Sequence, residues 1–226
     1  MEIKPIAYIR NDFTSKFGIP RQSGIAEEIE SVIVFEKEYR NPDALRGIEE
    51  FSHLWLIWEF SENKQSDEWS PTVRPPKLGG NVRKGVFATR SPFRPNPLGL
   101  SCVKLIGTKK NEENGTVIII SGADLMNGTP IYDIKPYVPY SDSHPEASAG
   151  FAVDEAAAAL SVKIPQEVLS DFPENKLSAL SAVLSQDPRP GYHHSPERLY
   201  GLEFAGYDVR FRVDGNVLTV CEIEKL

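Results

Sequence analysis

The sequence predicts a mainly β protein, with an antiparallel β-barrel over most of the chain and a smaller α+β domain at the C-terminus. Short runs rich in Val, Ile, Leu, Phe and Trp recur between turn-forming residues in the first 125 residues. No amphipathic helix of about ten to fifteen residues separates these runs, as a doubly wound α/β sheet would require. A Gly-rich fingerprint after a first strand is also absent from the sequence, which argues against a Rossmann cofactor site.

Each expected element of the barrel rests on a local pattern. Strands are expected at residues 5–10, 30–36, 53–60, 85–89, 100–108 and 115–125. The stretch from Asn111 to Gly115 predicts a hairpin turn between the last two strands. A short helix is expected near 42–50, because Asn41 can cap it and Pro42 suits its first position.

The character of the sequence changes after about Pro145. Residues 160–165 read as a strand, and 174–186 carry leucines and a valine at helical spacing. Alternating residues at 207–213 and 217–223 flank Asp214-Gly215-Asn216, which predicts a hairpin. The expected division is therefore a barrel domain at 1–150 and an α+β domain at 151–226.

Composition excludes several classes of protein. The 226 residues are 40% hydrophobic and 25% charged, which favours a globular chain with a sizeable core. No stretch approaches the roughly 20 apolar residues of a membrane helix, and the first residues lack an apolar run of signal-peptide length. We therefore expect a cytoplasmic protein without membrane contact. The four histidines lack metal-site spacing, so no metal is expected.

Positive charge is concentrated in one segment. The net charge is −7, yet residues 71–110 contain nine Lys and Arg and neither Asp nor Glu. Such asymmetry indicates a local site for an anion. A solvated basic face with acidic neighbours folded against it explains the charge equally well, so both interpretations stay open at this point.

Four clusters place polar or conformationally special residues among apolar runs. They lie at 19–24, 74–81, 89–97 and 124–137. Proline fixes φ, so arginines between prolines are held ready for a phosphate or a carboxylate. Asn127-Gly128 can adopt positive φ and bring backbone amides close to a ligand. One such cluster alone is an ordinary turn, but four in one chain predict a shared pocket.

The motifs in these clusters resemble the TrmO family of tRNA methyltransferases. They are PRQ at 20–22, RPP at 74–76, LGGN at 78–81, ATRSPFRPNPLGLS at 88–101 and NGTPIYDIKPY at 127–137. The stretch QDPRPGY at 186–192 is similar to the family's C-terminal signature. The motifs occur together and in the family's order, which makes the resemblance specific.

The resemblance implies a fold, a reaction and an assembly. Family members combine an antiparallel β-barrel catalytic domain with a smaller C-terminal domain. They use S-adenosylmethionine without a Rossmann fold, and they methylate N6 of the threonylcarbamoyladenosine at position 37, just 3′ of the tRNA anticodon. They work as homodimers. The resemblance therefore predicts a tRNA-modifying enzyme whose partner is the anticodon loop.

The same resemblance implies a set of cofactor-binding residues. They are Pro20, Arg21, Gln22, Ser61, Glu62, Arg90, Leu100, Asn127, Gly128, Thr129 and Pro130. The last four match an element usually written DGTP, and Asn127 departs from it by replacing a carboxylate with an amide.

Catalytic and substrate-binding roles are hypotheses drawn from the ionisable groups near these motifs. Asp133 and Tyr137 are candidate general bases, and Lys135 could stabilise negative charge on the carbamoyl oxygen. A surface ion pair between Asp133 and Lys135 is the structural alternative. Residues predicted to contact RNA or substrate are Arg74, Arg94, Asn96, Arg189 and Tyr192.

Two other functions remain open from the sequence. A non-catalytic barrel could bind a nucleotide or phosphate through the same arginines. A methyltransferase acting on a different substrate would bind the cofactor without preferring tRNA that carries threonylcarbamoyladenosine.

Overall fold

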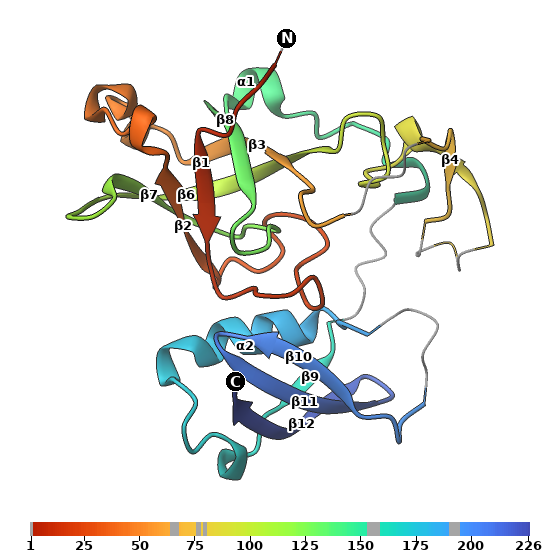
Figure 1. Ribbon diagram of the computed structural model, residues 1–226. Helices are drawn as coiled ribbons and strands as arrows, with labels where there is room; N and C mark the ends of the chain where they lie inside the picture. The colour runs from red at the N-terminus through yellow and green to blue at the C-terminus, as the bar shows by residue number, and fades with distance from the viewer. Residues whose placement is uncertain (1, 64–67, 76–77, 79–80, 153–158, 190–194) are drawn as a thin grey trace.

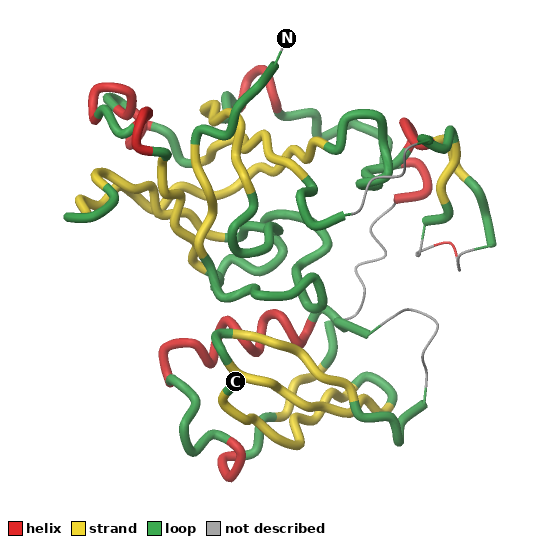
Figure 2. The backbone as a smooth tube through the Cα atoms, viewed as in Figure 1, coloured by secondary structure: helices red, strands yellow, loops and turns green. Residues whose placement is uncertain are grey.

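The computed structural model describes residues 2–63, 68–75, 78, 81–152, 159–189 and 195–226, and strands dominate its regular structure (Figure 2). Six strands close into a barrel in the order β1-β2-β7-β6-β3-β8, and β8 pairs back to β1. All neighbours are antiparallel. The strands are β1 (Ala7–Arg10), β2 (Glu30–Phe35), β3 (His53–Glu59), β6 (Leu98–Asn111), β7 (Gly115–Ser121) and β8 (Pro130–Pro136). The predicted mainly β fold is confirmed.

Alternation along each strand fills the barrel. Successive side chains of a strand point to opposite faces, so β3 sends Leu54, Leu56 and Trp58 into the core and leaves Trp55 and Ile57 outside. The core is lined mostly by branched aliphatic residues of the six strands. The β6–β7 hairpin turns between Asn111 and Gly115, as predicted.

The helix expected near 42–50 is two short 3-10 helices, η2 (Pro42–Leu45) and η3 (Ile48–Glu50), which follow η1 (Lys37–Tyr39). The Asn41 side chain accepts a hydrogen bond from the backbone N–H of Asp43 at 3.0 Å, so the predicted cap is confirmed. Gly47 separates the two helices with a φ of +85°, a conformation that glycine adopts without strain.

The strand expected at 85–89 is wrong. The chain there forms β5 (Lys84–Gly85), paired with β4 (Thr72–Val73), and then η5 (Val86–Ala88). Val86 is buried while Phe87 is 72% exposed, so this apolar run does not enter the barrel. Figure 1 shows the excursion that carries β4 projecting from the barrel. The short elements after β8 are α1 (Pro139–Asp142) and η6 (Gly150–Ala152).

A second sheet with one covering helix forms the C-terminal part. Its order is β10-β11-β12-β9, and β9 is parallel to β12. Helix α2 crosses the side of this sheet that faces the barrel (Figure 1). The elements are β9 (Ser161–Lys163), η7 (Gln166–Val168), η8 (Glu174–Lys176), α2 (Leu177–Ser185), β10 (Tyr200–Phe204), β11 (Tyr207–Asp214) and β12 (Val217–Lys225). The expected helix and hairpin are both present.

The second hydrophobic core joins the two parts of the chain. Phe13, Ala26 and Ile29 belong to it although they precede or connect barrel strands. A Cβ on Gly18 would lie 2.1 Å from Cδ1 of Leu202, and Gly18 has a φ of +88°, so glycine is required there. Because this core draws on both sides of residue 150, the division expected there stays a prediction. No helix in the described part of the chain is long and apolar enough to cross a membrane.

Candidate functional site

A cavity of about 650 Å³ lies at one end of the barrel, where β3 ends and β6 begins. We call it the large cavity. Four separate segments wall it: residues 16–22, 55–63, 90–100 and 124–129. Its volume falls in the range of pockets that bind small molecules and cofactors.

Most of the predicted cofactor residues meet in the large cavity. The lining residues that were predicted for the cofactor are Pro20, Arg21, Gln22, Ser61, Glu62, Arg90, Leu100 and Thr129. The Arg90 guanidinium donates a hydrogen bond to Oε1 of Gln22. This bond joins residues 89–97, which we call the proline loop, to the segment after β1. Residues separated by 68 positions in sequence therefore share one wall.

The Asn127-Gly128 turn forms hydrogen bonds with β1 and the residue that follows it. Oδ1 of Asn127 accepts the backbone N–H of Asn11 at 3.2 Å, and the Gly128 N–H bonds the carbonyl of Ile9 at 2.9 Å. Gly128 has a φ of +84°, as expected for this turn. Cofactor contacts by Asn127, Gly128 and Pro130 stay predictions, because only Thr129 of the four lines the large cavity.

The wall of the large cavity contains a hydrogen-bonded carboxyl group that the sequence did not single out. Trp58 Nε1 donates to Oγ of Ser101 at 2.9 Å, and this hydroxyl donates to Oδ1 of Asp124 at 2.5 Å. Burial raises the pKa of Asp124, while the bond from Ser101 and the charge of Arg90 act in the opposite direction. Asp124 opens the fourth polar cluster, and that position was the signal that could have identified it.

The residues fit a ligand that has both apolar rings and charged groups. Apolar side chains come from Ile19, Trp58, Phe60, Leu100 and Met126. Cationic groups and carboxyl groups come from Lys16, Arg21, Arg90, Arg94, Glu59, Glu62 and Asp124. An adenine ring, ribose hydroxyls and an amino-acid group, the parts of S-adenosylmethionine, match this set of donors, acceptors and apolar surfaces.

The predicted catalytic residues lie on β8 and beside it, outside the lining of the large cavity. Nζ of Lys135 is 2.9 Å from Oδ2 of Asp133, and both side chains are well exposed. The Tyr137 ring packs against Trp55 with centroids 5.7 Å apart. The ion pair is the structural alternative raised above, and the catalytic roles stay predictions.

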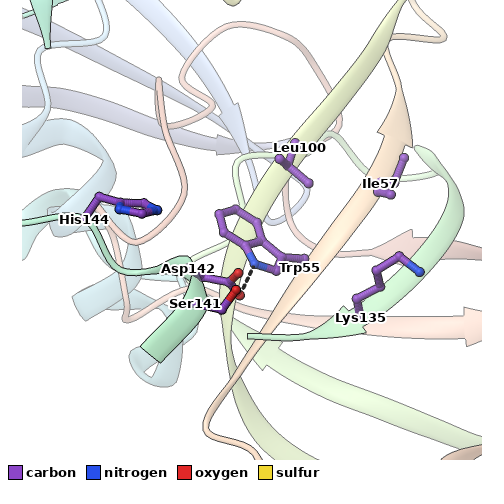
Figure 3. A pocket seen from close by; sticks show the side chains of 7 residues that line it. All are labelled: Trp55, Ile57, Leu100, Lys135, Ser141, Asp142 and His144. Carbon is purple, nitrogen blue, oxygen red and sulfur yellow. Dashed lines mark hydrogen bonds between the residues drawn. The ribbon is translucent and has the colours of Figure 1, made fainter. Parts of the chain in front are cut away.

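A second pocket of about 370 Å³ adjoins the large cavity on the outer face of the barrel (Figure 3). We call it the Trp55 pocket, and its lining is Trp55, Ile57, Leu100, Lys135, Ser141, Asp142 and His144. Trp55 and Leu100 also line the large cavity. The two spaces therefore share a wall, and Lys135 reaches the smaller one.

The residues predicted for substrate binding divide into three groups. Arg94 and Asn96 line the large cavity, and Arg74, which follows β4, does not. Arg189 forms a two-pronged ion pair with Asp187, with N–O distances of 2.7 and 2.8 Å, and its side chain is 11% exposed. Tyr192 lies outside the described residues. The substrate roles of these residues stay predictions.

The Asp187–Arg189 pair lies where the C-terminal part of the chain approaches the large cavity. Burial opposes ionisation of Asp187, but the hydrogen bonds and charge of Arg189 lower its pKa, with a further contribution from Arg21. Arg21 lines the large cavity. The signature stretch at 186–189 is therefore close enough to the cavity to interact with it electrostatically.

Comparison with known proteins gives matches over nearly the whole chain. The family model described as the tRNA-methyltransferase O N-terminal domain matches residues 8–143, and the TrmO C-terminal domain matches 157–226. The tRNA (adenine(37)-N6)-methyltransferase of Escherichia coli (strain K12) is 39% identical over 94% of this chain and 93% of that protein. A putative S-adenosylmethionine-dependent methyltransferase, RcsF of Pseudomonas aeruginosa, is 37% identical over 92% of this chain and 91% of its own.

Solved structures agree with the sequence matches. The crystal structure of TrmO from Pseudomonas aeruginosa has a TM-score of 0.77 at 30% identity, and the match covers 99% of this chain and 98% of that one. The predicted enzyme class, a methyltransferase that uses S-adenosylmethionine, is confirmed by these relatives. The barrel, the large cavity and both family models lead to one conclusion: the chain belongs to the tRNA-methyltransferase O (TrmO) family.

Proposed function

We propose that this protein methylates N6 of adenosine 37 in tRNA, and that the base it methylates already carries the threonylcarbamoyl group. The observation that carries the proposal is the meeting of four distant segments, represented by Gln22, Glu62, Arg90 and Thr129, in one cavity suited to S-adenosylmethionine. The proposal further includes action as a homodimer in the cytoplasm, which follows from the family resemblance.

The large cavity is the proposed site of the methyl donor. Arg90 is held by Gln22 and is suited to a carboxylate, while Asp124 and Glu62 can accept hydrogen bonds from hydroxyl or amino groups. Trp58 and Met126 offer apolar surface for a purine ring. S-adenosylmethionine, when bound, supplies an electrophilic methyl group on its sulfonium sulfur.

The chain then has to position the adenosine, exclude water and accept the proton that N6 loses. Positioning for an in-line transfer can supply a large part of the rate enhancement. We keep Asp133 or Tyr137 as the proposed proton acceptor, and Lys135 as the cation near the carbamoyl oxygen. Asp133 and Lys135 pair with each other in this structure, so binding of the substrate would have to rearrange this contact for both to act on the base.

We propose that the basic residues on and beside β4 and β5 bind phosphates of the tRNA. Arg74, Arg83 and Lys84 lie on β4, β5 or beside them, and Arg94 lies on the proline loop. Arg83 donates to Oγ1 of Thr72 at 2.9 Å, which leaves other guanidinium N–H groups available for phosphate. Binding of tRNA should therefore weaken as salt increases, because counterions are released when phosphates are neutralised.

The test is transfer of tritium from labelled S-adenosylmethionine to tRNA from cells with and without threonylcarbamoyladenosine. We expect incorporation only into the modified tRNA, and loss of at least about 100-fold in kcat/KM with Arg90→Ala. Arg46→Ala is the matched control, because Arg46 pairs only with Asp43 among the described residues and its side chain is 80% exposed.

The outcomes separate the rival functions. Equal incorporation into both tRNA pools would remove the threonylcarbamoyl requirement. Cofactor binding by calorimetry without incorporation into any tRNA would favour another substrate, and the absence of cofactor binding would favour a non-catalytic module. Light scattering of the purified protein tests the homodimer directly.

A further inference from the structure

The function proposed so far uses Lys135 and Leu100 singly, but it assigns no ligand to the Trp55 pocket that they line. Four elements build it: β3 supplies Trp55 and Ile57, β6 supplies Leu100, β8 supplies Lys135, and the last three lining residues lie in or just after α1. These side chains lie on the outer face of the barrel, next to the end where the large cavity opens. Trp55 and Leu100 line both spaces, so a ligand in one lies next to a ligand in the other.

The indole of Trp55 is held in a fixed orientation. Its Nε1 donates to Oδ2 of Asp142 at 2.9 Å, and the backbone N–H of Val138 donates to the same oxygen at 2.9 Å. These two hydrogen bonds lower the pKa of Asp142, so the acceptor stays charged at neutral pH. Tyr137 packs on the indole with centroids 5.7 Å apart. Figure 3 shows the ring standing between Leu100 and His144.

The chemistry of the lining selects a class of ligand. The surface is mainly apolar, which suits a flat aromatic ring. The indole of Trp55 is held rigidly enough for such a ring to stack on it. Lys135 adds an exposed ammonium group that can meet an anionic substituent when it leaves Asp133. RNA-binding proteins use such aromatic side chains to stack bases that are turned out of a loop.

We propose that the Trp55 pocket binds the target adenine of the RNA, stacked on Trp55, with the whole threonylcarbamoyl substituent, which includes the carbamoyl oxygen and an anionic carboxylate, directed to Lys135. Leu100, which lines both spaces, then lies beside the base and the methyl donor and leaves N6 free to meet the methyl group. This inference rests on the proposed function, and it adds the site where the nucleobase is held. It also explains why the predicted catalytic residues gather around this pocket rather than in the large cavity.

Kinetics of Trp55→Leu and Trp55→Phe test the stacking. We expect Trp55→Leu to raise KM for the modified tRNA roughly tenfold or more, the range for loss of one stacked base, and Trp55→Phe to keep most of the affinity. The Kd for S-adenosylmethionine, measured by calorimetry, should change by less than about threefold, well below the stacking effect. Tyr140→Leu is the matched control, because Tyr140 lies in the same α1 segment, is 93% exposed and does not line the pocket.

The free nucleosides test the ligand class without any methyl transfer. With S-adenosylhomocysteine present, saturation-transfer NMR should detect threonylcarbamoyladenosine more strongly than adenosine, and Lys135→Met should remove most of that preference. This result stands even if no tRNA is methylated, so failure of the proposed function is distinguishable. An unchanged KM in Trp55→Leu would overturn the inference. A change of oligomeric state in that variant would also overturn it, because a second copy would then cover the pocket.

Discussion

Gly99 gives the sharpest stability prediction, because its neighbour is a fixed indole ring. Gly99 lies on β6 opposite Trp58 of β3, and both residues line the large cavity. A Cβ at position 99 would lie 2.3, 2.4 and 2.7 Å from three indole carbons of Trp58. Carbon atoms in contact sit about 3.5–4.0 Å apart, so the ring would have to retreat by more than about 1 Å.

The ring has little room to retreat. Trp58 is 7% exposed, its Nε1 is bonded to Ser101, and its ring packs on Phe60 with centroids 4.3 Å apart. Overpacking costs about 1–3 kcal/mol, and loss of a buried hydrogen bond costs about 1–3 kcal/mol more. Gly99→Ala should therefore lower the free energy of unfolding by about 3 kcal/mol. It should also weaken S-adenosylmethionine binding, because the displaced ring borders the large cavity.

Urea unfolding followed by circular dichroism measures the effect. With a slope of roughly 2 kcal/mol per molar urea, the midpoint should fall by about 1.5 M. Gly85→Ala is the control, since Gly85 has a φ of −58° and a Cβ there meets nothing within 4 Å. That control should be neutral or slightly more stable. A Gly99→Ala protein that unfolds at the wild-type urea concentration would refute the packing argument.

Three further predictions concern other parts of the molecule. Burial raises the pKa of Asp124 above 3.8, so its stabilising protonated form is present below that pH and is lost as the pH rises through the folded-state value. Asp124→Asn stays neutral and can still accept a hydrogen bond from Ser101, so its stability relative to wild type should be greater at pH 7 than at pH 4. Calorimetry should show weaker cofactor binding by this variant. The pKa of Tyr132 is raised to about 12, first by burial and then by its hydrogen bond to a carboxylate, from 10.0. Stability linked to this phenol is complete below pH 10 and is lost between 10 and about 12, so Tyr132→Phe should show a smaller fall in melting temperature over that window. Phe13→Ala should cost about 3–5 kcal/mol in urea unfolding because Phe13 is fully buried, whereas Phe87→Ala, at a 72% exposed residue, should cost little.

The strands of the barrel could be predicted where one face is buried and the other is not. Alternation in 53–60 located β3, and a turn-forming stretch located the β6–β7 hairpin. Strand β8 was missed, because Asp133 and Lys135 interrupt the apolar pattern on its exposed face. The segment 85–89 was misassigned, because an apolar run does not reveal whether its side chains reach a core.

The candidate site was predictable in part for a similar reason. Proline-flanked arginines and the PRQ motif are visible in sequence, and the structure brings them into one cavity. The sequence alone does not select Asp124, and the alternating apolar run around Trp55 favours a core or dimer-interface role for that residue over a base platform. The roles inferred from the structure depend on partners fixed by closure of the barrel: Ser101 for Asp124 and Asp142 for Trp55. A single sequence without its relatives shows which residues are unusual, but not which distant residue each one meets.

The packing of Gly18 on Leu202 couples ligand binding in the large cavity to the stability of the C-terminal sheet. The strip of chain from Lys16 to Gln22 has the methyl donor's proposed site on one side and the C-terminal sheet's core on the other. Any free energy gained by a ligand on the first side therefore also stabilises the second. Packing of the C-terminal sheet therefore helps to hold this side of the proposed cofactor site in place. A donor analogue should slow cleavage by proteases at sites far beyond the cavity itself.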